Sequence, residues 1–191
     1  MSSSAHNSLK NHFLVAMPNM DDVQFDRAVV YLCEHTPEGA MGIIVNRPTE
    51  IQLEDMVKDM DMTPQDIETA QITVFDGGPV QTERGFVLHQ NTPNHKWAHS
   101  VQLTETLSIT TSFDILRAIC NKDGPDRFVI TLGFCQWAPG QLEDEIRENL
   151  WLHVPARESL VFDVPSEACW LASGALLGVD LRHIMTEVGH A

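Results

Sequence analysis

The pattern of apolar residues near the start of the chain predicts an antiparallel pair of strands. Residues 27–35 are rich in β-branched and aromatic side chains, a composition typical of strands. Residues 36–39 hold a proline and a glycine, which favour a tight reversal of the backbone. A second apolar run follows directly at 40–46. The pattern therefore predicts a β-hairpin over 27–46.

The rest of the chain alternates short apolar runs with stretches of helical periodicity. The short runs predict strands at 12–16, 72–76, 84–89, 106–110, 127–133, 151–154 and 159–163. Helical spacing predicts helices that begin after Thr49, near Thr63, at Ser112 and at Gly140, a nearly all-apolar and therefore largely buried helix at 166–178, and a final turn at 181–188. Because helices and strands interleave irregularly and one hairpin is antiparallel, the chain is expected to be α+β and not a doubly wound parallel sheet.

Cap and loop residues refine this outline. Thr49 and Gln52 have the spacing of a capping box, and Ser112 is a suitable N-cap for its helix. The inner face of the helix after Ser112 is predicted to carry Phe113, Leu116 and Cys120. Between 133 and 140, a loop that bears a tryptophan is expected to join a strand to the next helix.

Length and charge limit the classes of function. The chain has 191 residues, which fits one domain with a full core, expected at 11–191 after a flexible tail at 1–10. Acidic residues outnumber basic ones by 27 to 12, and the formal net charge is −15. Such a surface repels nucleic-acid backbones and anionic membranes, so neither is expected as a direct partner. The longest mostly apolar stretch, 168–179, is too short to span a bilayer.

The four cysteines form no recognisable framework. They lie in separate predicted elements, and no CxxC pair occurs among Cys33, Cys120, Cys135 and Cys169. Reduced thiols in a cytosolic protein are expected, without a disulfide, a structural metal or another cofactor.

Cys33 and His35 are the first candidate site. They are two residues apart on a predicted strand and therefore point to the same face. One interpretation is a thiol–imidazole pair, serving as a nucleophile or as half of a metal site. The other is a buried thiol beside a histidine at the end of the strand. The second is favoured, because same-face neighbours on a strand lie roughly 7 Å apart.

The other histidines offer little evidence of a metal site. His95 and His99 have the i, i+4 spacing, but they follow a proline in a predicted loop, and no HExxH or CxxC motif occurs. Structural or surface roles are favoured for these two and for His89 and His153.

Two further segments are candidates for recognition. Gly77 and Gly78 permit a close backbone approach, either to a ligand or to another strand, but they also suit a sharp turn, and the turn is favoured. Arg84 follows soon after and either holds an anion or pairs with Glu83 or Asp76. Trp137 precedes a helix whose first turn is acidic at 143–145, which opposes a phosphate at that helix terminus. The tryptophan therefore either anchors its loop in the core or forms part of an exposed recognition surface.

Three groups of residues resemble the signatures of the YqgE/AlgH family. The first runs from FDR at 25–27 through VYLCEH at 30–35 to NRP at 46–48. The second is GGPV at 77–80 with RGFVLH at 84–89, and the third is LGF at 132–134 with PGQLE at 139–143 and Trp151. The resemblance covers about residues 10–185 in order. The chain differs from the usual pattern at Cys135 and Gln136, where small residues are expected.

This resemblance implies a fold, a cellular location and no defined activity. The fold is a bifurcated, mostly antiparallel sheet bent into a pseudo-barrel and flanked by helices. The location is the cytoplasm of a bacterium. The family has been described as transcriptional regulators, but the charge of this chain and the lack of a convincing helix-turn-helix argue against direct DNA binding.

Two classes of function remain after these exclusions. The first is a non-catalytic module that binds a small molecule or a protein partner, with an indirect regulatory role. Its predicted recognition surface consists of Gly77, Gly78, Arg84, Trp137 and Gln141. The second is a small hydrolytic or thiol-dependent enzyme that uses Cys33 or Cys135 with a histidine. The sequence leaves the ligand, the partner and the oligomeric state open.

Overall fold

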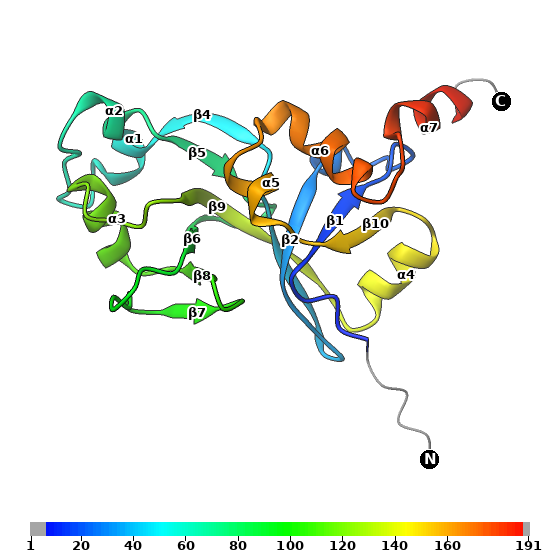
Figure 1. Cartoon of the computed structure of the whole chain (residues 1–191), viewed down its shortest axis with the longest axis horizontal. Helices are drawn as coiled ribbons and strands as arrows, with labels where there is room; N and C mark the ends of the chain where they lie inside the picture. Colours follow the sequence, from blue (N-terminus) through cyan, green and yellow to red (C-terminus); the bar gives the residue numbers. More distant parts are fainter. Residues whose placement is uncertain (1–6, 189–191) are drawn as a thin grey trace, which may run out of the picture.

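The strands of this computed structural model, which describes residues 7–188, join into one curled sheet (Figure 1). They are β1 (His12–Ala16), β2 (Val29–Thr36), β3 (Gly39–Ile44), β4 (Pro48–Gln52), β5 (Thr73–Asp76), β6 (Val80–Gln90), β7 (Ser100–Gln102), β8 (Leu107–Thr110), β9 (Phe128–Trp137) and β10 (Trp151–Pro155). The main path has the order β10-β1-β2-β3-β9-β6-β8-β7, with β4 and β5 branching from β9. All strand pairs are antiparallel except β5 with β9. The predicted α+β fold is therefore confirmed, and so is the bifurcated sheet.

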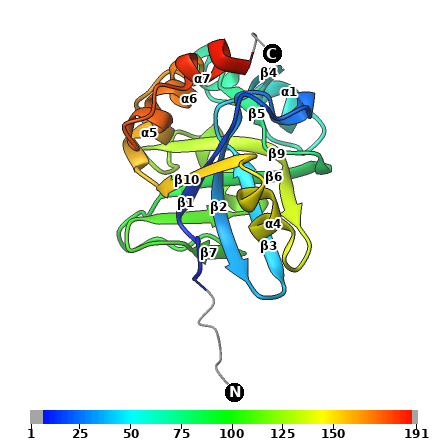
Figure 2. The same cartoon turned by 90° about the vertical axis from the view of Figure 1, so that its right-hand side faces the viewer.

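The sheet divides along β9. Val74 on β5 and Val87 on β6 both pair with Ile130 in the first half of β9. The last residues of β9 pair instead with β3, where Ala40 lies opposite Trp137. One long strand thus belongs to both branches, and the sheet curls around it into a half-barrel (Figure 2).

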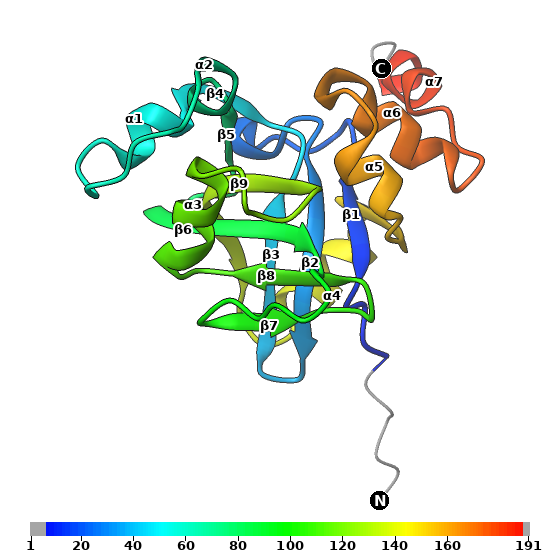
Figure 3. The same cartoon turned by 60° about the vertical axis from the view of Figure 1, so that its left-hand side comes forward.

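Short helices cover the two ends of the half-barrel (Figures 1 and 3). They are η1 (Val23–Phe25), α1 (Leu53–Val57), α2 (Ile67–Ala70), α3 (Phe113–Cys120), α4 (Gln141–Arg147), α5 (Glu158–Phe162), α6 (Ser166–Ala175) and α7 (Leu181–Val188). The first three α-helices gather beside β4, β5 and β6, and the last three gather beside β1 and β2. Each group covers a separate part of the core.

Strand alternation explains why both faces of β2 are buried. Val29, Tyr31 and Cys33 pack into one apolar cluster, which α5 and α6 cover. Val30 and Leu32 pack into a second cluster on the opposite face, which α4 covers. The predicted hairpin is confirmed, because β2 and β3 pair antiparallel across a short turn, with a bulge between Leu32 and Glu34.

Several predictions about local structure are wrong. The segment predicted as a strand at 159–163 is instead the end of α5 and its C-cap Asp163, and Leu160 and Val161 pack into the core from that helix. The helix predicted after Thr49 begins only at Leu53, because the Thr49 hydroxyl donates to Val74 O and β4 pairs with β5.

Phe113 is 62% exposed, although it was predicted on the inner face of α3. The buried residues of that helix are Ile115, Leu116, Ile119 and Cys120, so Phe113 lies at the margin of the buried face. The loop predicted from 133 to 140 is strand as far as Trp137, because pairing with β3 extends β9. The helix predicted as largely buried at 166–178 is α6, which ends at Ala175 and buries only one side, through Cys169, Trp170, Ser173 and Gly174.

The predicted flexible tail falls largely outside the described residues, which begin at 7. Within the described part, Leu9 is buried and its backbone N–H donates to His35 Nδ1 at 2.9 Å. The Ser8 hydroxyl donates to His35 O at 2.9 Å. Residues 8 and 9 are therefore attached to the end of β2.

Candidate functional site

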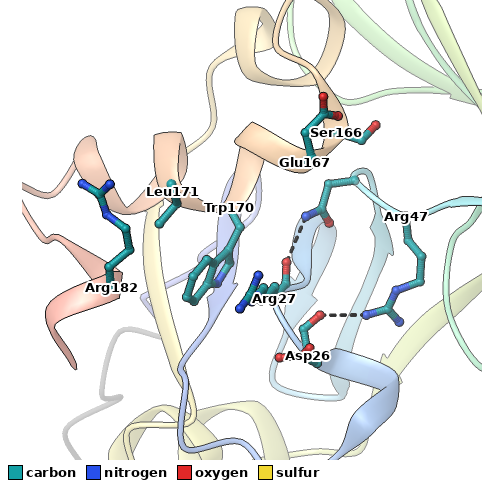
Figure 4. A pocket seen from close by; sticks show the side chains of 9 residues that line it. Asp26, Arg27, Arg47, Ser166, Glu167, Trp170, Leu171 and Arg182 are labelled. Carbon is teal, nitrogen blue, oxygen red and sulfur yellow. Dashed lines mark hydrogen bonds between the residues drawn. The ribbon is translucent and has the colours of Figure 1, made fainter. Parts of the chain in front are cut away.

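A pocket of about 430 Å³ opens where the turn before β2 meets α6 and the start of α7 (Figure 4). Its lining residues are Asp26, Arg27, Asn46, Arg47, Ser166, Glu167, Trp170, Leu171 and Arg182. Three of the chain's twelve lysines and arginines line this one pocket, in a protein whose net charge is −15. A volume of this size is within the usual range of small-molecule sites.

The turn that carries Arg27 is held by two side chains from the end of the hairpin. Arg27 has a φ of +52°, a left-handed conformation that is uncommon for residues other than glycine. Asn46 Nδ2 donates to Arg27 O at 2.9 Å, and Asn46 Oδ1 accepts the N–H of Val29 at 2.9 Å. Arg47 Nη2 donates to Asp26 O at 3.0 Å, and the same guanidinium donates to Gln24 O. These bonds fix the direction in which Arg27 leaves the backbone.

The Arg27 guanidinium lies over the indole of Trp170, 5.6 Å from the ring centroid. Trp170 is 4% exposed, and its Nε1 donates to Ala16 O at 2.8 Å, so the ring is fixed in the core. Among the described residues, no carboxylate lies within ion-pair distance of Arg27. The guanidinium is thus oriented by an aromatic surface while its planar fork of donors keeps the capacity to bind an acceptor.

The other charged residues around the pocket differ in the partners that they already have. Arg182 donates from Nε and Nη2 to the carboxylate of Asp180, both at 3.0 Å. Arg47 is engaged by backbone carbonyls. Asp26 and Glu167 also line the pocket and offset part of its positive charge. A singly charged anion is therefore better suited to this pocket than a multiply charged one.

The glycines of the predicted recognition surface lie at a crossing of two backbone segments. Gly77 and Gly78 are buried, and a side chain at Gly78 would meet Phe134 O at 2.4 Å. Gly77 N–H donates to Leu132 O at 2.7 Å. The close approach that the glycines permit is thus to β9, an alternative that the sequence left open beside the favoured sharp turn.

Trp137 and Gln141, also predicted for that surface, meet at Glu145. Trp137 is 4% exposed, and its Nε1 donates to Glu145 Oε2 at 2.9 Å. Trp151 Nε1 donates to the same oxygen at 2.8 Å, and Gln141 Nε2 donates to Oε1 at 2.9 Å. The carboxylate joins the end of β9, α4 and β10, so Trp137 anchors this region in the core.

Arg84 lies on a different surface. Its guanidinium is exposed, 5.3 Å from the centroid of the Phe86 ring, and donates to Gln81 Oε1 at 3.3 Å. It lines a small cavity of about 190 Å³ together with Met56 of α1, Met60 and residues of β6, β8 and α3. The structure brings Trp137 and Gln141 together but does not bring Arg84 to them.

The two candidate thiols are buried and protonated at neutral pH. Cys33 is 5% exposed, its Sγ lies 3.7 Å from Tyr31 O, and burial raises its pKa from 9.0 to about 12. Cys135 is 1% exposed beside Gly77 O, and burial raises its pKa further above the ordinary thiol value. A protonated thiol is a weak nucleophile, so neither residue is prepared for covalent chemistry.

His35 is not paired with Cys33, because both nitrogens of its ring have other partners. Nδ1 accepts the Leu9 N–H, so Nε2 carries the proton and donates to Glu143 Oε1 at 2.9 Å. The imidazole thereby connects the N-terminal segment, β2 and α4.

We expect alkylation by iodoacetamide at neutral pH to be very slow for all four cysteines in the folded protein. Burial raises the pKa of Cys33 to about 12 and that of Cys169 to about 11, and it also raises the pKa of Cys120 and Cys135. These pKa values in the folded protein exceed those of thiols in the unfolded chain. Burial of the protonated thiols therefore makes its full contribution to the stability of the folded state below about pH 9, and this contribution is lost as the pH rises toward the folded-state pKa values. Mass spectrometry measures the alkylation of each cysteine over time, and one rapidly labelled thiol at pH 7 would contradict the expected slow reaction.

The histidines do not gather into a metal site within residues 7–188. His95 lies against Trp97, with ring centroids 3.9 Å apart, and His153 lies 6.0 Å from His12. No three histidine, cysteine or acidic side chains in the described part of the chain come close enough to hold a metal ion. Within the same residues, no helix has the length and apolar character needed to cross a membrane.

The sequence-based surface omitted the residues that line the pocket of Figure 4. Arg27, Asn46 and Arg47 all belong to the first group of family-like residues, and that grouping is the signal that could have identified them. Trp170 and Arg182 come from the C-terminal helices, and no local motif connects them to the hairpin. Trp170 reaches the hairpin because α6 packs against β1 and β2, and Arg182 follows on α7, which packs against α6.

Comparisons with known proteins agree with this fold. A family model described as AlgH-like matches residues 13–182. A UPF0301 protein of Nitrosococcus oceani is 47% identical over 182 residues, covering 95% of this chain and 96% of the relative. Another, of Nitrosospira multiformis, is 43% identical over 96% of this chain and 97% of the relative.

Two solved structures are also similar to the chain. The solution structure of the AlgH protein from Pseudomonas aeruginosa has a TM-score of 0.79 and 41% identity, with complete coverage of both chains. The crystal structure of a protein from Corynebacterium diphtheriae has a TM-score of 0.71 at 19% identity, covering 92% of this chain and 90% of that one. The second likeness concerns the fold alone.

Proposed function

The chain belongs to the AlgH-like family, and on that premise we propose that it is a non-catalytic module that binds a small carboxylate-bearing molecule in the pocket around Arg27. The observation that carries this proposal is the Arg27 guanidinium, which is fixed over Trp170 at the pocket wall and has no carboxylate partner among the described residues. Arginine can bind a carboxylate through two parallel hydrogen bonds.

The apolar part of the ligand has a suitable surface in the same pocket. Trp170 and Leu171 line it beside the arginines. Asp26 and Glu167 disfavour a ligand with several negative charges. The ligand class that fits is a monocarboxylate with an apolar or aromatic body.

The lining residues support binding without chemistry. None of the nine is a histidine or a cysteine, so Ser166 has no imidazole or thiolate beside it in the pocket. Elsewhere, the buried thiols remain protonated at neutral pH because burial raises their pKa values. An indirect regulatory role, through a conformational or surface change on ligand binding, is compatible with this proposal. Direct contact with DNA is not favoured by a net charge of −15.

We expect Arg27→Ala to weaken monocarboxylate binding by about tenfold to a hundredfold, the equivalent of a charge-assisted hydrogen bond of about 1.5–3 kcal/mol. The probes are acetate, benzoate and 3-phenylpropanoate, titrated by isothermal calorimetry. Alanine keeps the Cβ atom, so the backbone strain at the positive φ of this position is unchanged.

Arg117→Ala is the matched control, because Arg117 is an exposed arginine on α3, at the other end of the half-barrel. It should leave the affinity unchanged, and Arg27→Lys should give an intermediate loss, since lysine keeps the charge but not the planar fork. The proposal fails if none of the three carboxylates binds saturably, or if Arg27→Ala binds them as well as Arg117→Ala does.

A further inference from the structure

A second polar site lies on the β6-β8-β7 branch of the sheet (Figure 3). Ser108 on β8 is directly opposite His89 on β6 and Gln102 on β7. Thr110 is opposite Ser100, and alternation places it on the same face as Ser108. A row of hydrogen-bonding side chains therefore crosses three adjacent strands on one face.

A cavity of about 620 Å³ is bounded by this face and by the segment that follows β6. Its lining residues are His89, Asn91, Thr92, Asn94, His95, Lys96, Trp97, Ser100, Gln102 and Ser108. Every one of these side chains carries a hydrogen-bonding atom. The cavity is larger than the pocket around Arg27 and shares no lining residue with it.

The deepest polar groups of the cavity are held in place by a hydrogen-bond network. His89 is 2% exposed, with Nδ1 donating to Gln90 O and Nε2 bonded to Thr110 Oγ1, both at 2.8 Å. Thr110 Oγ1 is bonded in turn to Ser100 Oγ at 2.9 Å. Burial lowers the pKa of His89, which keeps the ring uncharged at neutral pH. The Ser108 hydroxyl, 2.5 Å from Asn91 Oδ1, is fixed in the same way.

The balance of charge distinguishes this cavity from the first pocket. None of its lining residues is acidic, and Lys96, the one lysine or arginine of the lining, is exposed, so that solvent screens its charge. The remaining polar groups are the hydroxyls, carboxamides and imidazoles, which can both donate and accept, and the indole N–H of Trp97, which only donates. Such groups complement ligand hydroxyls, which also do both.

The aromatic residues argue against a stacked planar ligand. Trp97 is 8% exposed and lies against His95, with ring centroids 3.9 Å apart. The indole thus forms part of the wall and leaves little open face for a flat ring. From this combination we propose that the cavity on the β6-β8-β7 face is a second binding site, specific for a neutral polyhydroxylated molecule of monosaccharide size.

The experiment is a titration of the full-length protein with neutral monosaccharides, followed by two-dimensional ¹H–¹⁵N NMR. The probes are D-glucose, D-galactose, D-mannose and D-ribose, with D-glucosamine and D-glucuronate as charged analogues. At least one neutral sugar should shift resonances of residues 89–110 saturably, and both charged analogues should bind more weakly. Gln102→Ala should weaken that binding by about threefold to tenfold, the value of one hydrogen bond.

Gln102 is exposed on an edge strand, so its substitution should leave the fold intact. Gln102→Trp should block the cavity, while Gln136→Ala, an exposed glutamine on β9, and Arg27→Ala should leave sugar binding unchanged. The proposal is overturned if no neutral sugar binds saturably, if a charged analogue binds more tightly than every neutral one, or if Gln102→Ala and Gln102→Trp both bind as the parent does.

Discussion

Gly78→Ala should destabilise the protein by about 3 kcal/mol or more, or prevent folding, because it combines a close backbone contact with an unfavourable φ. A Cβ atom at position 78 would lie 2.4 Å from both the carbonyl carbon and oxygen of Phe134. Those atoms belong to the backbone of β9 and cannot rotate away as a side chain could. The φ of Gly78 is +144°, which residues with a Cβ rarely adopt.

Gly178→Ala separates these two causes. Gly178 has a φ of +71°, but nothing lies within 4 Å of its would-be Cβ, so only backbone strain is added, about 1 kcal/mol. Urea unfolding followed by tryptophan fluorescence measures both variants. Equal losses in the free energy of unfolding for Gly78→Ala and Gly178→Ala would contradict a tight crossing between the Gly77–Gly78 segment and β9.

Glu145→Ala should lower the free energy of unfolding by about 2–4 kcal/mol, because the indole N–H groups of Trp137 and Trp151 both lose their acceptor. The two rings are 4% and 2% exposed, so water cannot readily replace the carboxylate. Their nitrogens lie 2.9 and 2.8 Å from the same Oε2 atom. Glu145→Gln should cost less, since the amide retains one oxygen as acceptor.

Glu148→Ala is the control on the same helix end, because Glu148 is the exposed residue that follows α4. The change in the free energy of unfolding caused by Glu148→Ala should be within about 0.5 kcal/mol of zero, as for most surface positions. Equilibrium unfolding in urea again gives the comparison. Equal stability of Glu145→Ala and Glu148→Ala would show that the two indoles do not depend on this carboxylate.

Local sequence patterns predicted correctly the strands and helices that pair or pack with the segments next to them along the chain. The β2–β3 hairpin is such a case, since its pairing follows a short turn. The segment predicted as a strand at 159–163 is the opposite case, because its apolar run of Leu160, Val161 and Phe162 resembles a strand. They form a helix in which Leu160 and Val161 contact the core. Tertiary packing overrides local propensity there. Strand β7 is short and fully exposed, so it has no apolar pattern to detect.

The candidate site was harder to predict for the same reason. Arg27 and Trp170 lie near opposite ends of the chain, and their stacking follows from the position of α6 over β1 and β2. For Gly77 and Gly78 the sequence favoured a sharp turn over a close backbone approach and could not identify β9 as the neighbour, because that contact forms only in the folded chain. Burial of Trp137 likewise depends on Glu145 and Trp151, which meet it only in the folded chain.

The most direct measurement of the central claim is an NMR titration with benzoate that observes the Arg27 Nε–H and the Trp170 Nε1–H. If the pocket around Arg27 binds carboxylates, both signals should shift together and saturably, with one affinity, and Arg27→Ala should abolish the shift at Trp170. Saturable shifts confined to Arg84, Trp137 and Gln141, with Arg27 and Trp170 unmoved, would contradict it and place recognition on the surface predicted from the sequence.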